Sequence, residues 1–114
     1  MKRVVVLDDD ALQVLMIEGL LDSRGIQCRD WSKNKDLSDT RAVICDWLMP
    51  ESWTKYRYDL IEKATEIGIP VAIYTVGGTT REILSETYPG VDLDVIQKSQ
   101  DRGSLVKWLT KNGL

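Results

Sequence analysis

The sequence predicts an α/β domain in which a parallel sheet of five strands is covered by helices on both faces. Two observations lead to this fold class. Five short runs of apolar, often β-branched residues are typical of buried strands, and most stretches between them repeat apolar residues at helical spacing. Strands that alternate with helices favour a parallel sheet, because each crossover between parallel neighbours needs a connection that a helix provides. The length of 114 residues fits one core, so a single domain is predicted over residues 1–114.

The first half of the chain contains three of the predicted strands and one long helix. In chain order these elements fall at residues 4–7, 11–24, 26–31 and 42–45, the second of them being the helix. The strand at 26–31 is the most polar of the three, which favours an edge position. Residues 32–40 are polar and have room for at most about two turns of helix. The second helix of the alternation is therefore predicted to be shortened or missing.

The second half of the chain continues the alternation with three helices and two strands. The helices are predicted at residues 58–67, 80–88 and 101–111, and the strands at 71–74 and 93–96. Right-handed crossovers then leave only a few possible topologies for the sheet.

Single residues mark the expected ends of several elements. Asp10 suits the N-cap or the first turn of the first helix. Gly25 and Gly68 stand where a left-handed residue commonly ends a helix. Pro50 interrupts the chain after the third strand.

Composition excludes several classes of protein. The net charge is −3, and lysine and arginine are spread along the chain, so no nucleic-acid footprint is predicted. No apolar run is long enough for a membrane span or a signal-peptide core, which places the protein in the cytoplasm. Histidine is absent, and Cys28 and Cys45 have no further cysteine beside them, so a zinc site is not expected and two reduced thiols are.

Four of the predicted strands end in residues suited to metal or phosphate chemistry. In an open parallel sheet, ligands bind beyond the carboxyl ends of the strands. Each of these residues has a simpler explanation, as part of a solvated loop, as a cap or as an ordinary surface group. Their arrival from four separate strands at one edge favours a functional site. In chain order they are Asp8, Asp9, Asp46, Thr75 and Lys98.

The three carboxylates at this edge are expected to need a cation. Two carboxylates about 4 Å apart repel each other by about 4 kcal/mol in partly screened surroundings. Oxygen ligands alone favour Mg²⁺, which is typically held by one or two carboxylates together with phosphate oxygens. A carboxylate can itself attack phosphorus and form an aspartyl phosphate, and a lysine and a threonine hydroxyl can hold the transferred group.

Four sequence segments resemble a known family. They are Val-Leu-Asp-Asp-Asp at 6–10, Cys-Asp-Trp-Leu-Met-Pro at 45–50, Ile-Tyr-Thr-Val-Gly at 73–77 and Val-Ile-Gln-Lys-Ser at 95–99. In this order they are similar to the response regulator receiver domains of two-component signal transduction, the CheY-like family, over the whole chain. The resemblance implies a doubly wound, flavodoxin- or CheY-like sheet of strand order 2-1-3-4-5.

The resemblance also implies roles for single residues. Asp46 corresponds to the phosphoacceptor and is also a metal ligand. Asp9 would bind Mg²⁺ directly, Asp8 mainly through water, and the Leu48 carbonyl would be a further ligand, with Mn²⁺ as a possible substitute. The acid pair is taken as Asp8 and Asp9, because the spacing to Gly25 fits the family's first helix.

Two more residues would act on the phosphoryl group itself. Thr75 would hydrogen-bond to it and shift toward it on activation, and Lys98 would pair with another of its oxygens. Such a protein is a switch rather than a classical enzyme, although it can catalyse its own phosphorylation and dephosphorylation. Its partners would be a histidine kinase or phosphotransfer protein and a downstream effector protein or domain. No direct nucleic-acid or membrane contact is expected, and the state would be a monomer or a weak homodimer.

Several positions depart from the family's usual pattern. Val95 stands where the family often has an aromatic switch residue, and Ser99 stands where proline usually follows the lysine. The loop after Pro50 is expected to be crowded by aromatic residues, among them Trp53 and Tyr56. These departures put the usual relay from phosphate to partner in doubt.

Two alternatives to a phosphorylation switch remain. One is a pseudo-receiver that acts as a phosphorylation-independent interaction module, which the shortened second helix and Val95 favour and the complete set of five residues opposes. The other is a phosphohydrolase with an aspartyl nucleophile, which would need a second aspartate where Leu48 stands.

The tryptophans divide into two groups. Trp31, Trp108 and, with them, Tyr74 are expected to pack in or against the core. Trp47 adjoins Asp46. It fits equally well as a lid over the core and as a partner contact or gate at the phosphorylation site.

Overall fold

The structure is a computed structural model that describes residues 2–77, 81–98 and 102–114. Within these residues it has five strands and four helices. The strands are β1 (Arg3–Leu7), β2 (Gln27–Asp30), β3 (Thr40–Cys45), β4 (Val71–Thr75) and β5 (Asp94–Gln97). The helices are α1 (Ala11–Asp22), α2 (Glu51–Ile67), α3 (Arg81–Thr87) and α4 (Gly103–Lys111).

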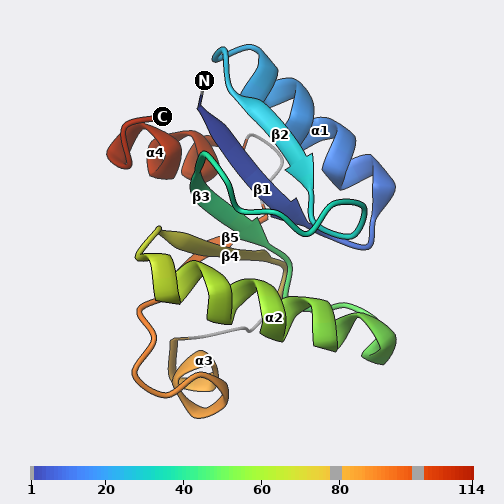
Figure 1. Ribbon diagram of the computed structural model, residues 1–114, viewed down its shortest axis with the longest axis vertical. Helices are drawn as coiled ribbons and strands as arrows, with labels where there is room; N and C mark the ends of the chain where they lie inside the picture. The colour runs from blue at the N-terminus through green and yellow to red at the C-terminus, as the bar shows by residue number, and fades with distance from the viewer. Residues whose placement is uncertain (1, 78–80, 99–101) are drawn as a thin grey trace.

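The five strands form one parallel sheet in the order β2-β1-β3-β4-β5. This order confirms the predicted doubly wound fold, and β2 lies at an edge as its polar sequence predicts. Figure 1 shows α1 and α4 over one face of the sheet and α2 and α3 over the other. All strands run in the same direction, so their carboxyl ends meet at one edge of the sheet.

Two apolar layers hold the helices to the sheet. On β1, Val4 and Val6 pack on the side of α1 and α4, whereas Val5 and Leu7 pack on the side of α2 and α3. All four are fully buried. This alternation follows from the two-residue period of a strand, and it explains why the central strands are apolar at every position.

The connection between β2 and β3 contains no helix, which confirms the shortened second crossover. Residues 31–39 form turns and irregular chain instead. The Trp31 side chain is fully buried in the layer on the α2 side, and Leu37 packs against the same layer. Lys63 of α2 lies over the indole, with its Nζ 5.7 Å from the ring centroid. One large aromatic side chain thus covers strand surface that a helix would otherwise cover.

The helix after Pro50 is longer than predicted. The apolar repeat predicts a start near residue 58, but α2 begins at Glu51. Trp53 and Tyr56 therefore lie on a helix and not in a crowded loop, which corrects the prediction. The reason is Arg57, which is 8 % exposed and lies on the buried side of α2 with Leu60. A charged residue on the inner side interrupts the apolar repeat by which the helix is recognised in the sequence.

The other predicted boundaries agree with the structure to within a few residues. Asp10 caps α1, since its side chain accepts a hydrogen bond from the Leu12 amide at 3.0 Å. Gly68 ends α2 in a left-handed conformation with φ of 77°, which glycine adopts without steric cost. The predicted starts of the last two helices, at residues 80 and 101, lie outside the described residues.

The predicted core aromatics are buried: Trp31, Tyr74 and Trp108 are 0, 2 and 6 % exposed. Over the described ranges, none of the helices has the length and apolar character needed to cross a membrane.

Candidate functional site

The site lies where β1 and β3 end side by side. Asp8 follows the last residue of β1, and Asp46 follows the last residue of β3. The Asp46 amide donates a hydrogen bond to the Leu7 carbonyl at 2.8 Å, which continues the strand pairing up to the site. Hydrogen bonding of the sheet therefore sets the separation of the two aspartates.

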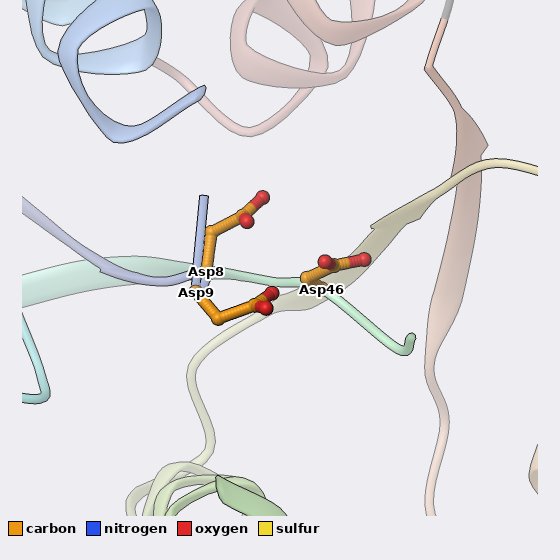
Figure 2. A group of neighbouring side chains, drawn as sticks. All are labelled: Asp8, Asp9 and Asp46. Carbon is orange, nitrogen blue, oxygen red and sulfur yellow. The ribbon is translucent and has the colours of Figure 1, made fainter. Parts of the chain in front are cut away.

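Three carboxylates come together at this edge, as the sequence predicts. Asp8, Asp9 and Asp46 each have a carboxylate oxygen within 4.8 Å of the others. Asp8 and Asp46 are only 4 and 6 % exposed, whereas Asp9 is exposed. Figure 2 shows that two come from the β1 end and one from the β3 end. Oxygen donors at this spacing, one of them open to solvent, suit a hard divalent cation that keeps part of its water shell.

Lys98 reaches this cluster from the end of β5. Its ammonium donates to Asp8 Oδ2 at 2.9 Å and lies 3.5 Å from Asp46 Oδ2. The Lys98 amide donates to the Thr75 carbonyl at 2.7 Å, which places the lysine at the same sheet edge. Burial lowers the pKa of Lys98, but its hydrogen bond to Asp8 and the negative charges of Asp8 and Asp46 outweigh burial and raise it. The lysine is therefore a fixed positive charge among the acids.

The Asp46 carboxyl has an unusual protonation equilibrium. Burial and the nearby Asp8 carboxylate raise its pKa from 3.8 to about 6, although Lys98 and the Trp47 amide lower it. The Trp47 amide donates to Asp46 Oδ1 at 2.8 Å and orients the carboxylate. At neutral pH most of the Asp46 carboxylate is ionised, as a nucleophile requires.

Thr75 ends β4 at the same sheet edge, and Leu48 follows Asp46 by two residues along the chain. Thr75 is fully buried at the end of β4, and its hydroxyl donates to the Val76 carbonyl at 3.3 Å. It makes no hydrogen bond to the acidic cluster among the described residues. The Leu48 side chain is 58 % exposed, and its carbonyl accepts no hydrogen bond within the same residues. Both groups therefore keep capacity for a bound ligand.

Arg57 contacts Trp47, and this contact was not predicted from the sequence. Its guanidinium lies 4.1 Å from the centroid of the Trp47 ring and donates to the Trp47 carbonyl at 2.6 Å. Trp47 is half-buried and meets Tyr88 edge-on, with ring centroids 6.2 Å apart. Trp47 thus packs against α2 and the end of α3. The contact could have been predicted only if the helix had been expected to begin before residue 58, which would have placed Arg57 on its inner face.

Asp10 caps α1 but does not belong to the carboxylate cluster, so its replacement tests whether Asp8 and Asp9 are the acid pair. Replacing Asp10 with alanine is expected to lower the free energy of unfolding by about 1 kcal/mol, because the Leu12 amide loses its acceptor. Mg²⁺ affinity is expected to stay unchanged, since Asp10 is not in the carboxylate cluster. Thermal unfolding and a Mg²⁺ titration of Asp10→Ala check both; a large loss of affinity would place Asp10 in the acid pair.

Solved structures of known proteins share this architecture. No protein-family model and no curated protein matches the sequence. The chemotaxis protein CheY4 of Vibrio cholerae superimposes with a TM-score of 0.74 at 16 % identity, over 97 % of this chain and 98 % of that one. A response regulator receiver protein of Burkholderia phymatum gives 0.71 at 22 % identity, over 100 % and 97 %. One from Pseudomonas putida gives 0.66 at 21 % identity, over 96 % of each.

The chain has a CheY-like receiver fold. At these identities the likeness concerns the fold, and the residues of this chain must carry any argument about function. In this receiver fold the carboxylates of Asp8, Asp9 and Asp46 and the ammonium of Lys98 lie together. Val95 is half-buried against the layer on the α2 side, and Ser99 lies outside the described residues.

Proposed function

We propose that this protein is a phosphoacceptor switch of a two-component or phosphorelay system, with Asp46 as the acceptor. The observation that carries the proposal is the position of the Asp46 carboxylate, within 4.8 Å of two other carboxylates and 3.5 Å from the Lys98 ammonium. A nucleophile between a candidate cation site and a fixed positive charge suits phosphoryl transfer, in which positioning and charge neutralisation dominate.

The chemical step follows from these positions. An Asp46 carboxylate oxygen attacks phosphorus and forms a new P–O bond. The bond from phosphorus to the donor breaks, and the donor leaves with the electron pair and takes up a proton. Lys98 pairs with one oxygen of the transferred group and the Thr75 hydroxyl turns from the Val76 carbonyl to another. Hydrolysis of the aspartyl phosphate by water returns the switch to its starting state, so the chain takes part in chemistry without being a classical enzyme.

Mg²⁺ fits the donor set, with Mn²⁺ as a substitute. Asp8, Asp9, Asp46 and the Leu48 carbonyl would hold it, and all of these ligands are oxygens. The cation would neutralise charge on the phosphoryl group and on the acids.

The partners follow from the same proposal. A histidine kinase or phosphotransfer protein would donate the phosphoryl group, and an effector protein or domain would read the changed surface. We place the switch in the cytoplasm, as a monomer or weak homodimer, with Cys28 and Cys45 as free thiols. No direct role for nucleic acid or membrane is part of the proposal.

A pseudo-receiver is the second candidate. The observation that favours it is the absence of a helix between β2 and β3, together with Val95 in place of an aromatic residue. Such a protein would bind its partner whether or not Asp46 is phosphorylated. A phosphohydrolase is disfavoured, because the position two residues after Asp46 is a leucine.

One titration separates the two candidates. Mg²⁺ and then beryllofluoride are added while tryptophan fluorescence is followed, since the Trp47 amide donates a hydrogen bond to the Asp46 carboxylate. A Mg²⁺-dependent change and labelling by acetyl phosphate are expected for the wild type, and Asp46→Asn is expected to abolish the labelling and the beryllofluoride response.

Asp92→Asn is the matched control, because Asp92 is exposed and lies in the loop before β5. It is expected to behave as the wild type. Absence of both the fluorescence change and the labelling in the wild type would rule out the phosphorylation switch and leave the pseudo-receiver.

A further inference from the structure

A buried arginine without a carboxylate partner lies directly beside the candidate phosphoacceptor site. Arg57 of α2 is 8 % exposed, and within the described parts of the chain it forms no ion pair. Arginine is rarely buried unless it is paired, because removing the guanidinium from water is costly. Contacts other than an ion pair must therefore stabilise the buried guanidinium.

The contacts of Arg57 converge on the residue that follows the acceptor. Its Nη1 donates to the Trp47 carbonyl at 2.6 Å, and its Nε donates to the Tyr88 hydroxyl at 3.3 Å. The guanidinium also lies over the Trp47 ring at 4.1 Å. Tyr88 is held in turn by Tyr58, whose ring centroid is 5.0 Å away. The Trp47 ring, the Trp47 carbonyl and the Tyr88 hydroxyl thus leave the guanidinium little freedom.

Both backbone polar groups of Trp47 are engaged, and this determines the course of the chain. The Trp47 amide donates to Asp46 Oδ1, and the Trp47 carbonyl accepts from Arg57. The next carbonyl along the chain belongs to Leu48. The Leu48 side chain is 58 % exposed, so core packing does not hold this residue in place. The direction of the Leu48 carbonyl is set by the backbone torsions of Leu48 relative to the peptide plane between Trp47 and Leu48, and the hydrogen bond from Arg57 to the Trp47 carbonyl anchors that plane.

We propose that Arg57 is a positioning residue: through the Trp47 carbonyl it fixes the backbone from Asp46 to Leu48 so that the Leu48 carbonyl faces the cation site. The inference rests on the proposed function, in which that carbonyl is a metal ligand. Groups behind the ligands commonly affect metal affinity strongly because they set ligand orientation. Arg57 would act in this way on a backbone ligand, from a helix that supplies no ligand itself.

The test compares Arg57→Met with the wild type by NMR, in chelator and during a Mg²⁺ titration. Without metal, the Trp47 amide is expected to exchange faster in Arg57→Met, because the next peptide, which contains the Trp47 carbonyl, has lost its anchor and the Trp47 backbone is freer to move. With metal, the dissociation constant for Mg²⁺ is expected to rise about tenfold. A residue that only stabilised the fold would lower the unfolding midpoint and leave the Mg²⁺ constant of the folded protein unchanged.

Three further variants complete the experiment. Arg57→Lys keeps a charged donor and is expected to recover part of the affinity. Arg41→Met is the matched control, because Arg41 is exposed at the start of β3, away from the site, and it is expected to behave as the wild type. Tyr88→Phe removes only the hydroxyl that contacts Arg57 and is expected to weaken Mg²⁺ binding about threefold. This variant and Arg57→Lys decide the matter if Arg57→Met fails to fold.

The outcomes separate the two proposals. If the wild type binds Mg²⁺ and the Arg57 and Tyr88 variants bind it equally well, the positioning role is wrong and the proposed function stands. If the wild type binds no Mg²⁺, the proposed function fails. Unchanged exchange of the Trp47 amide in the metal-free Arg57 variants overturns the positioning role in either case.

Discussion

Replacing Lys98 with methionine is expected to destabilise the metal-free protein by about 3 kcal/mol at about pH 8, because it leaves two buried carboxylates without the ammonium group that pairs with them. Lys98 is 2.9 Å from Asp8 and 3.5 Å from Asp46, and the side chains of these acids are only 2 and 7 % exposed. The pKa of Lys98 is raised in the folded state. Its stabilising contribution is therefore fully present below its unfolded pKa and is lost only as the pH rises through the folded pKa.

The loss in Lys98→Met is expected to depend on pH and on Mg²⁺. The lysine lowers the pKa of Asp46, so in its absence Asp46 takes up its proton at a higher pH than in the wild type, and the loss shrinks as the pH falls from about 8 toward about 6. Added Mg²⁺ is expected to restore part of the stability by replacing the missing positive charge. Urea unfolding in chelator and in Mg²⁺ measures both effects.

The control for this variant is Lys107→Met, since Lys107 is exposed on α4. A change within about 0.5 kcal/mol is expected there. Combining Lys98→Met with Asp46→Asn is expected to cost less than the sum of the single changes, because the two side chains interact. An additive result would show that the lysine and the acceptor are not coupled.

Replacing Asp46 with asparagine is expected to stabilise the metal-free protein by about 1–3 kcal/mol at about pH 8, although it removes the proposed acceptor. Asparagine keeps the Oδ1 atom that accepts from the Trp47 amide and removes the repulsion with Asp8. The pKa of Asp46 is raised from 3.8 to about 6. Each unit of such a shift corresponds to about 1.4 kcal/mol against the ionised form in the folded state.

The sign of the pH dependence follows from the same shift. Between pH 3.8 and about 6 the folded state binds the Asp46 proton and the unfolded state does not. Protonation of Asp46 therefore stabilises the wild type as the pH falls through this window. Above about pH 6 the folded state carries the full cost of the ionised carboxylate. The advantage of Asp46→Asn is expected to be largest above about pH 6 and to shrink toward pH 4.

Unfolding midpoints of both proteins in chelator across this range measure the difference. Asp92→Asn, at a side chain that is 95 % exposed, is the control and is expected to leave the midpoint unchanged. Mg²⁺ is expected to stabilise the wild type more than Asp46→Asn, because the variant has lost one of the proposed carboxylate ligands. An Asp46→Asn protein no more stable than the wild type at about pH 8 would contradict close packing of the three acids.

Much of the site was predictable because strand ends are readable in this sequence. The central strands β1 and β3 are short apolar runs that each stop at an aspartate, and parallel strands bring such ends to one edge. Asp8, Asp46 and Lys98 therefore met where the pattern placed them. These residues are far apart in the sequence, but backbone hydrogen bonding of the sheet brings the strand ends that carry them close together.

The sequence did not reveal the surroundings of the site. Arg57 interrupts the apolar repeat of α2, so the start of this helix and its contact with Trp47 were both missed. Nothing local in the sequence marks an arginine whose partners are a backbone carbonyl, an indole ring and a tyrosine hydroxyl. Trp31 was predicted to be buried, but only the packed structure shows it covering the sheet in the absence of a second helix.

The sequence by itself determined the order of strands and helices, the residues at the strand ends and the lack of a full second helix, since periodicity and turn residues act locally. Only the tertiary structure decided that Arg57 is buried beside Trp47, that Trp31 fills the space next to β1 and β3, and that the pKa of Asp46 is raised. These properties depend on which distant groups share a small volume and how much water they exclude. Burial and charge in that volume are set by the whole fold.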